Sequence, residues 1–206
     1  MMYRIVWWIC WAIIQVFFRR RVIGAKNIPS KGPVIIASNH ISGLDPPVLG
    51  TSYWRSGVYM AKEELFRNRF IGWFIGSIYA FPVKRGVPDR ASLKYSLDSL
   101  EQGKLLAIFP EGTRSETGEL QEAEMGVGMI AYRSGAPVVP AWIYGSNRVL
   151  PKGGGLRFPP LLVVFGEPLR FVAPEGTKPG RAEYEDAARK IMAAIAELRD
   201  QYTPRR

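Results

Sequence analysis

The chain has 206 residues, of which 47% are hydrophobic and 22% charged, as expected for one globular domain large enough to bury a core. Its formal net charge of +10 suits nucleic acid, an anionic membrane surface or a phosphorylated substrate, but no nucleic-acid-binding motif is recognisable, so we expect no nucleic-acid partner. The single cysteine, Cys10, excludes an intramolecular disulfide, and one cysteine with one histidine makes a poor zinc ligand set, so we expect no metal.

The first 21 residues differ in composition from the rest of the chain. Residues 5–18 are apolar apart from Gln15, include three tryptophans and precede Arg19-Arg20-Arg21. As a helix they would be about 21 Å long, which is short for a hydrocarbon core of roughly 30 Å. We therefore predict that residues 1–21 form a membrane-associated helix in the interface, with its aromatic rings at the headgroups and its arginines toward anionic lipid. The alternative is a buried core helix.

Strand patterns and helix patterns alternate along the rest of the chain. Short apolar runs predict strands at residues 34–38, 59–62, 105–109, 138–144 and 161–165, with a further short strand at 169–172. Helical patterns fall at 46–53, 89–102, 126–134 and 181–202, and Asp89 is a plausible N-cap. This alternation predicts an α/β fold for residues 22–206: a single domain with a mostly parallel, mixed sheet flanked by helices.

Residues 66–82 form a second strongly apolar stretch. Its aromatic and aliphatic side chains occupy too many faces for an ordinary surface helix. Three interpretations are open: the stretch belongs to the core, it lines a groove for a lipid tail, or it dips into the bilayer beside residues 1–21. Because it leads directly to Lys84 and Arg85, a groove here would end in two positive charges.

A loop after the strand at 34–38 combines a histidine with an aspartate. His40 is the only histidine of the chain, and Asp45 lies five positions later. A loop leaving a buried strand can hold a side chain still against a substrate. Histidine is suited to proton transfer near neutral pH, and a neighbouring aspartate fixes its tautomer and stabilises the imidazolium. We therefore predict that His40 takes a proton from an alcohol and that Asp45 orients His40.

A second loop follows the strand at 105–109. Residues 109–115 read Phe-Pro-Glu-Gly-Thr-Arg-Ser, which places the Glu111 carboxylate, a flexible glycine and the Arg114 guanidinium on one loop. The fork of donors on Arg114 suits a phosphate. Because both loops follow strands of a largely parallel sheet, we expect His40 and Glu111 at the same carboxyl edge.

The two loops, in this order and roughly seventy residues apart, resemble the glycerolipid acyltransferase family, and within it the PlsC-type 1-acylglycerol-3-phosphate acyltransferases. The family block Asn-His-x-x-x-x-Asp is matched by Asn39, His40 and Asp45, and the block Phe-Pro-Glu-Gly-Thr-Arg-Ser is matched without exception at 109–115. Residues 81–86 and 138–141 match two further blocks more loosely. The resemblance covers about residues 24–172 and makes 22–206 the acyltransferase catalytic domain.

The resemblance implies transfer of a fatty acyl group from acyl-CoA or acyl carrier protein to the free hydroxyl of 1-acylglycerol-3-phosphate, giving phosphatidic acid without a further cofactor. It implies His40 as general base and Asp45 as its partner. The implied phosphate-binding residues are Arg85, Arg114 and Lys84, and the implied substrate-positioning residues are Glu111, Gly112, Thr113, Asn39 and Ser42.

Several alternatives stay open within this resemblance. Asn39 and Ser42 would give either local support or an oxyanion contact, and Glu111 would hold the glycerol end or only orient Arg114. Many family members carry a lysine at the position of Glu124, so Lys62 or Lys84 would have to replace that cation.

The acceptor could also be glycerol-3-phosphate, another lysophospholipid or a glycolipid. A different class of function is a non-catalytic protein that binds anionic lipid. In either case we expect association with the cytoplasmic face of a membrane.

Overall fold

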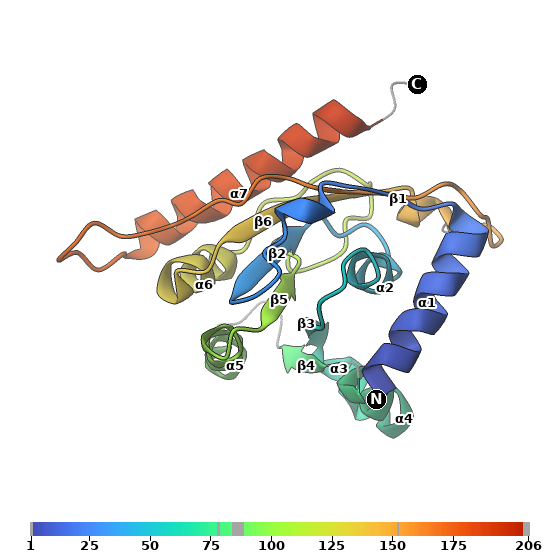
Figure 1. The fold of residues 1–206 in the computed structure, drawn as a ribbon, viewed down its shortest axis with the longest axis horizontal. Coiled ribbons are helices and arrows are strands. Elements are labelled where there is room, and N and C mark those ends of the chain that lie inside the picture. The colour runs from blue at the N-terminus through green and yellow to red at the C-terminus, as the bar shows by residue number, and fades with distance from the viewer. Residues whose placement is uncertain (1, 78, 84–88, 152, 204–206) are drawn as a thin grey trace.

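A computed structural model describes residues 2–77, 79–83, 89–151 and 153–203. Within these ranges the chain forms one sheet with the strand order β1-β7-β6-β2-β5-β3-β4 (Figure 1). All neighbouring strands pair in parallel except β6 and β7, so the mixed, mostly parallel sheet is confirmed. The strands are β1 (Arg21–Ile23), β2 (Val34–Ser38), β3 (Gly57–Lys62), β4 (Ala80–Val83), β5 (Leu105–Ile108), β6 (Val138–Tyr144) and β7 (Leu162–Phe165).

Helices cover both faces of this sheet (Figure 1). The core on one face joins the sheet to α5, α6 and α7, and the core on the other face joins it to α1 and α2. Every residue of β2 is buried, because a central parallel strand is covered on both faces. The helices are α1 (Met2–Phe18), α2 (Asp45–Gly50), α3 (Glu63–Arg67), α4 (Arg69–Ser77), α5 (Arg90–Glu101), α6 (Met125–Ser134) and α7 (Arg181–Tyr202), with short 3-10 turns η1 (Ala25–Asn27) and η2 (Ser146–Arg148).

The predicted bounds of β2, β6 and α7 agree with the structure, and the Asp89 side chain caps α5 by accepting from Ser92 N at 3.0 Å. Two strands were not predicted. β1 begins inside the arginine cluster, and β4 contains Pro82, which an edge strand tolerates because its outer side needs no N–H donor. The strand predicted at 169–172 is reduced to one antiparallel bridge between Leu169 and Val138.

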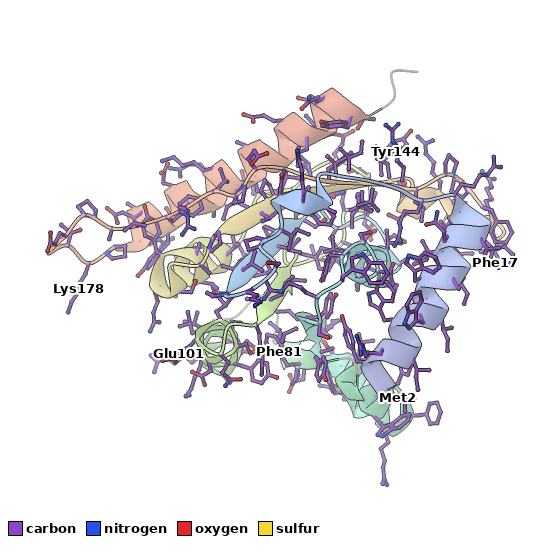
Figure 2. All side chains as sticks on the ribbon, viewed as in Figure 1. Met2, Phe17, Phe81, Glu101, Tyr144 and Lys178 are labelled. Atoms are coloured by element: carbon purple, nitrogen blue, oxygen red, sulfur yellow. The ribbon has the colours of Figure 1, made fainter. Side chains whose placement is uncertain are left out.

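The apolar stretch at 66–82 is divided between α3, α4 and β4. Phe81 on β4 is buried and packs on Tyr95 of α5, with 4.4 Å between the ring centroids, and Figure 2 shows it between that helix and the sheet. Phe70 and Trp73 on α4 are instead 78% and 59% exposed. The core interpretation is therefore wrong for α4 and right only for the strand that follows.

Helix α1 packs on the sheet through one side and leaves the other in solvent. Ile14 and Phe18 are buried, whereas Trp8, Val16 and Phe17 are exposed, and Figure 2 shows Phe17 on the side of α1 that faces away from the sheet. The start of α1 lies beside α4, where Tyr3 stacks on Tyr79 with 5.1 Å between centroids. Among the described helices, none combines the length and the apolar character needed to cross a bilayer.

The prediction that the arginines at 19–21 all point toward lipid is wrong for Arg20. Its side chain is buried, and Nη1 donates to Thr51 Oγ1 and, at 3.5 Å, to Val48 O at the end of α2. Desolvation by burial lowers the pKa of the Arg20 guanidinium to about 10. Arg20 therefore faces the protein interior, while Arg19 and Arg21 on either side of it are exposed.

Candidate active site

The end of β2 and the start of α2 bring His40 and Asp45 together. His40 Nδ1 lies 2.9 Å from Asp45 Oδ2, so the predicted pair forms. Asp45 is fully buried at the first turn of α2, and the His40 ring stacks on Phe109 at 4.1 Å with an interplanar angle of 20°. His40 Nε2 has no hydrogen-bond partner in the part of the chain that the structure describes. With Nδ1 held by the carboxylate, Nε2 is the nitrogen available to accept a proton.

The Asp45 carboxylate accepts three further hydrogen bonds. The backbone N–H groups of Ile41 and Ser42 both donate to Oδ2 at 2.7 Å. The hydroxyl of Ser146 donates to Oδ1 at 2.6 Å from the turn after β6. Together with His40 Nδ1 these donors give both carboxylate oxygens a partner, which offsets the cost of burying the group. Ser146 was not predicted, because nothing in the spacing of a serine 101 residues away marks it.

Asn39 and Ser42 both make hydrogen bonds within the protein. Asn39 is fully buried; its Nδ2 donates to Ile143 O at 3.0 Å and its Oδ1 accepts from Ile143 N at 2.7 Å. The amide thus adds a rung between β2 and β6 beyond their backbone pairing. The Ser42 hydroxyl accepts from Leu44 N at 3.2 Å. Of the two predicted alternatives, the geometry fits local support.

Glu111 joins the two loops at the carboxyl edge. Its Oε1 accepts from His40 N at 3.1 Å and its Oε2 accepts from Gln121 Nε2 at 3.0 Å. Burial raises the pKa of the Glu111 carboxyl, partly opposed by the hydrogen bonds from Gln121 and from His40 N. His40 and Glu111 therefore meet as predicted, but the described contacts of Glu111 do not include Arg114.

Arg114 lies beside the His40–Asp45 loop. A Cβ placed on Gly43 would lie 3.5 Å from Arg114 Nη1, and Ser115 N donates to His40 O at 2.8 Å, which ties the two loops together. The guanidinium is exposed, and within the described ranges it makes neither an ion pair nor a hydrogen bond. Five donors are therefore available close to the histidine.

The other residues predicted to belong to the site lie in different surroundings. Thr113 is exposed, and Gly112 has a φ of +66°, where a Cβ would lie 3.0 Å from Glu124 Cγ. Lys62 ends β3 and pairs with Glu64 at 3.3 Å on the surface. Lys84 and Arg85 lie outside the described residues.

A cavity of about 640 Å³ opens beside the histidine. Phe109 lines it and also stacks on His40, so the cavity and the His40–Asp45 pair share one wall. Lys62, Arg90 and Glu124 contribute polar groups to its lining. The cavity lies between β3, β4, β5, α5 and α6, and the described residues of α4 do not line it. The apolar lining includes Met60, Leu93, Ile108, Val127, Met129 and Ile130.

Residues 19–144 match the family model described as Acyltransferase. The chain belongs to the acyltransferase family. This confirms the resemblance to glycerolipid acyltransferases that the motifs around His40 and Glu111 predicted.

Named relatives point the same way. A Bacillus subtilis 1-acyl-sn-glycerol-3-phosphate acyltransferase is 37% identical over 152 residues, covering 72% of this chain and 73% of the relative. A chloroplastic enzyme of that name from Brassica napus is 32% identical over 166 residues, covering 77% of this chain, but the match spans only 48% of the plant protein. The crystal structure of the 1-acyl-sn-glycerophosphate acyltransferase PlsC from Thermotoga maritima superposes with a TM-score of 0.76 at 26% identity, covering 99% of this chain and 81% of that one.

Proposed function

We propose that this acyltransferase moves a fatty acyl group from acyl-CoA or acyl carrier protein to the free hydroxyl of 1-acylglycerol-3-phosphate, giving phosphatidic acid. The observation that carries the proposal is the buried His40–Asp45 pair, which leaves Nε2 without a hydrogen-bond partner among the described residues. The His40 ring stacks on Phe109, which lines an apolar cavity. The names of the relatives support the choice of acceptor.

In this proposal the acyl group passes directly from the thioester to the acceptor hydroxyl. His40 Nε2 accepts the proton of the acceptor hydroxyl as its oxygen attacks the thioester carbonyl carbon. The new C–O ester bond forms and the C–S bond breaks. The imidazolium then returns the proton to the departing thiolate, so the histidine ends as it began. Asp45 stabilises the imidazolium through its contact with Nδ1.

The phosphate of the acceptor and the fatty acyl chain would bind in different surroundings. Arg114 offers a guanidinium beside the Gly43 segment of the catalytic loop, where it would pair with the acceptor phosphate in bidentate geometry. Lys84 and Arg85 are further candidates for this charge. The apolar cavity behind Phe109 would take an acyl chain, because its lining is mostly aliphatic and methionine side chains.

We also propose that the outer side of α1 and helix α4 lie in the interface of an anionic membrane on its cytoplasmic face. Trp8, Val16, Phe70 and Trp73 are apolar side chains that are each more than half exposed. Arg19, which follows the last residue of α1, is exposed as well. Aromatic side chains at the headgroups and arginines near anionic lipid stabilise such a position.

Substitution tests the membrane proposal better than deletion of residues 1–21, because Ile14 and Phe18 belong to the core. Val16 is 72% exposed, so Val16→Glu should fold and should lower the fraction bound to phosphatidylglycerol-containing vesicles. Gln102→Glu adds the same charge at an exposed site just after α5 and should bind as the parent chain does. Equal binding of both variants and the parent would contradict the proposal.

Thiol release from palmitoyl-CoA, with and without 1-acylglycerol-3-phosphate, tests the activity. We expect acceptor-dependent release that falls about 10²–10⁴-fold in His40→Ala, the usual loss for a general base. Acyl carrier protein and glycerol-3-phosphate serve as the alternative donor and acceptor. Release without acceptor would indicate a thioesterase, and no turnover of any donor–acceptor pair would leave the chain a lipid-binding protein; either result overturns the proposal.

A further inference from the structure

The hydrogen bond from Ser146 to Asp45 has no part in the proposed acyl-transfer steps. Its side chain is fully buried, and its hydroxyl donates to Asp45 Oδ1 at 2.6 Å. The residue starts η2, directly after β6, and β6 pairs in parallel with β2. The carboxyl end of β6 therefore delivers this hydroxyl to the same edge of the sheet as His40.

The four donors around Asp45 are divided unequally between its two oxygens. Oδ2 receives His40 Nδ1 and the N–H groups of Ile41 and Ser42. Oδ1 receives the hydroxyl of Ser146 alone among the described contacts. Loss of that hydroxyl would leave a fully buried carboxylate oxygen without a partner, whereas Oδ2 would keep all of its donors.

The backbone at Gly145 fixes where Ser146 lies. Gly145 has a φ of +91°, a conformation that favours glycine, and a Cβ there would lie 2.6 Å from the carbonyl oxygen of Pro160. The turn is closed by Arg148 N, which donates to Gly145 O at 3.1 Å. Ser146 is thus held by a turn that only glycine permits, which limits the freedom of its hydroxyl.

We propose that Ser146 is a positioning residue of the acyl transfer: its hydroxyl holds the Asp45 carboxylate in the orientation that stabilises the His40 imidazolium. The inference rests on the proposed function, because the imidazolium forms when the acceptor hydroxyl loses its proton. Hydrogen bonds to a charged acceptor are among the stronger ones in proteins, and they hold a catalytic side chain in its productive orientation.

Ser146→Ala tests the proposal, and the chain offers a matched control. Ser96 on α5 is also fully buried, and its hydroxyl donates at 2.7 Å, but to the backbone oxygen of Ser92. We expect Ser146→Ala to lower kcat roughly tenfold, equal to about 1.4 kcal/mol of transition-state stabilisation, with KM for both substrates unchanged. Ser96→Ala should keep the parent kcat whatever its effect on Tm.

A double-mutant cycle separates positioning from general loss of structure. In an Asp45→Asn background the ionised carboxylate is absent, so adding Ser146→Ala should change kcat less than about twofold. A tenfold loss in both backgrounds would mean that Ser146 acts through the fold rather than through Asp45. An unchanged kcat in Ser146→Ala would overturn the proposal directly.

A spectroscopic readout keeps this inference separable from the proposed function. The chain has one histidine, so ¹⁵N-labelled histidine gives a single imidazole, and its Nδ1-bound proton reports the bond to Asp45 without substrate. We expect Ser146→Ala to shift or broaden that proton signal and Ser96→Ala to leave it unchanged. If the parent chain shows no acyl transfer, the proposed function fails while this measurement still stands. An unchanged signal in Ser146→Ala overturns the inference alone.

Discussion

Replacing Asn39 by alanine would distinguish a structural amide from one that contacts the reacting carbonyl. The Asn39 side chain makes two hydrogen bonds with Ile143, at 2.7 and 3.0 Å, and has no exposed surface. Asn39→Ala removes both partners at once. The N–H and C=O of Ile143 would then be buried in the middle of the sheet without a hydrogen bond.

The cost follows from these two groups. Each buried polar group left without a partner costs about 1–3 kcal/mol, so the pair costs roughly 4 kcal/mol. For a chain of this size about 1 kcal/mol lowers Tm by roughly 2–4 °C, which gives a fall of about 8–16 °C. Typical domains have about 5–15 kcal/mol of stability, so the variant should remain folded at low temperature.

The assay is thermal unfolding by circular dichroism, followed by kcat measured well below the Tm of the variant. We expect kcat to stay within a few-fold of the parent value, because His40 and Asp45 keep their own contacts. Asn27→Ala is the control, since it removes one hydrogen bond, from Nδ2 to Phe165 O at 3.2 Å, at a half-buried site, and should lower Tm less. An unchanged Tm with a kcat reduced about 100-fold would refute this reasoning and make Asn39 an oxyanion donor.

Three further predictions concern the walls of the site. Arg114→Ala should raise KM for the phosphorylated acceptor much more than for the acyl donor, and equal effects on both would contradict a phosphate role. Burial raises the pKa of Glu111, so the stability that this carboxyl contributes is present below its unfolded pKa and is lost as pH rises through the folded value. The Tm of Glu111→Gln relative to the parent should therefore rise from about pH 4 to pH 7, and a constant difference would argue against it. Ala61 lines the cavity, so Ala61→Phe should shift the preference toward shorter acyl donors, which competition between donors of two chain lengths measures.

The sheet and the placement of the two loops could be predicted because their signals are local. The apolar run of β2 and the buried stripe of α7 mark their own bounds, and parallel pairing then places His40 and Glu111 at one edge. The motif residues place the candidate base and the candidate phosphate-binding guanidinium at that edge. These features depend on neighbouring residues along the chain, so the order of the residues is enough to find them.

Other features depend on which distant groups meet. The contact of Ser146 with Asp45 spans 101 residues, and nothing in the spacing of a serine reveals it. That His40 and Glu111 lie at one edge was predicted, but the hydrogen bond from His40 N to the Glu111 carboxylate was not. Strand β1 was missed because it has only three residues, begins with the last arginine of the cluster, and pairs with β7, which lies about 140 residues later in the chain. The apolar stretch at 66–82 left three interpretations open for a related reason: hydrophobicity shows that side chains avoid water, not what they pack against.

The short helix α2 has a guanidinium at one end and a carboxylate at the other. Asp45 lies in its first turn, and Arg20 bonds Val48 O near its last. Six helical residues span only about 9 Å, so the segment that leaves α1 and the acid behind the histidine are attached to one rigid piece. The proposed position of α1 on a membrane would therefore also determine how far the His40–Asp45 pair lies from that surface.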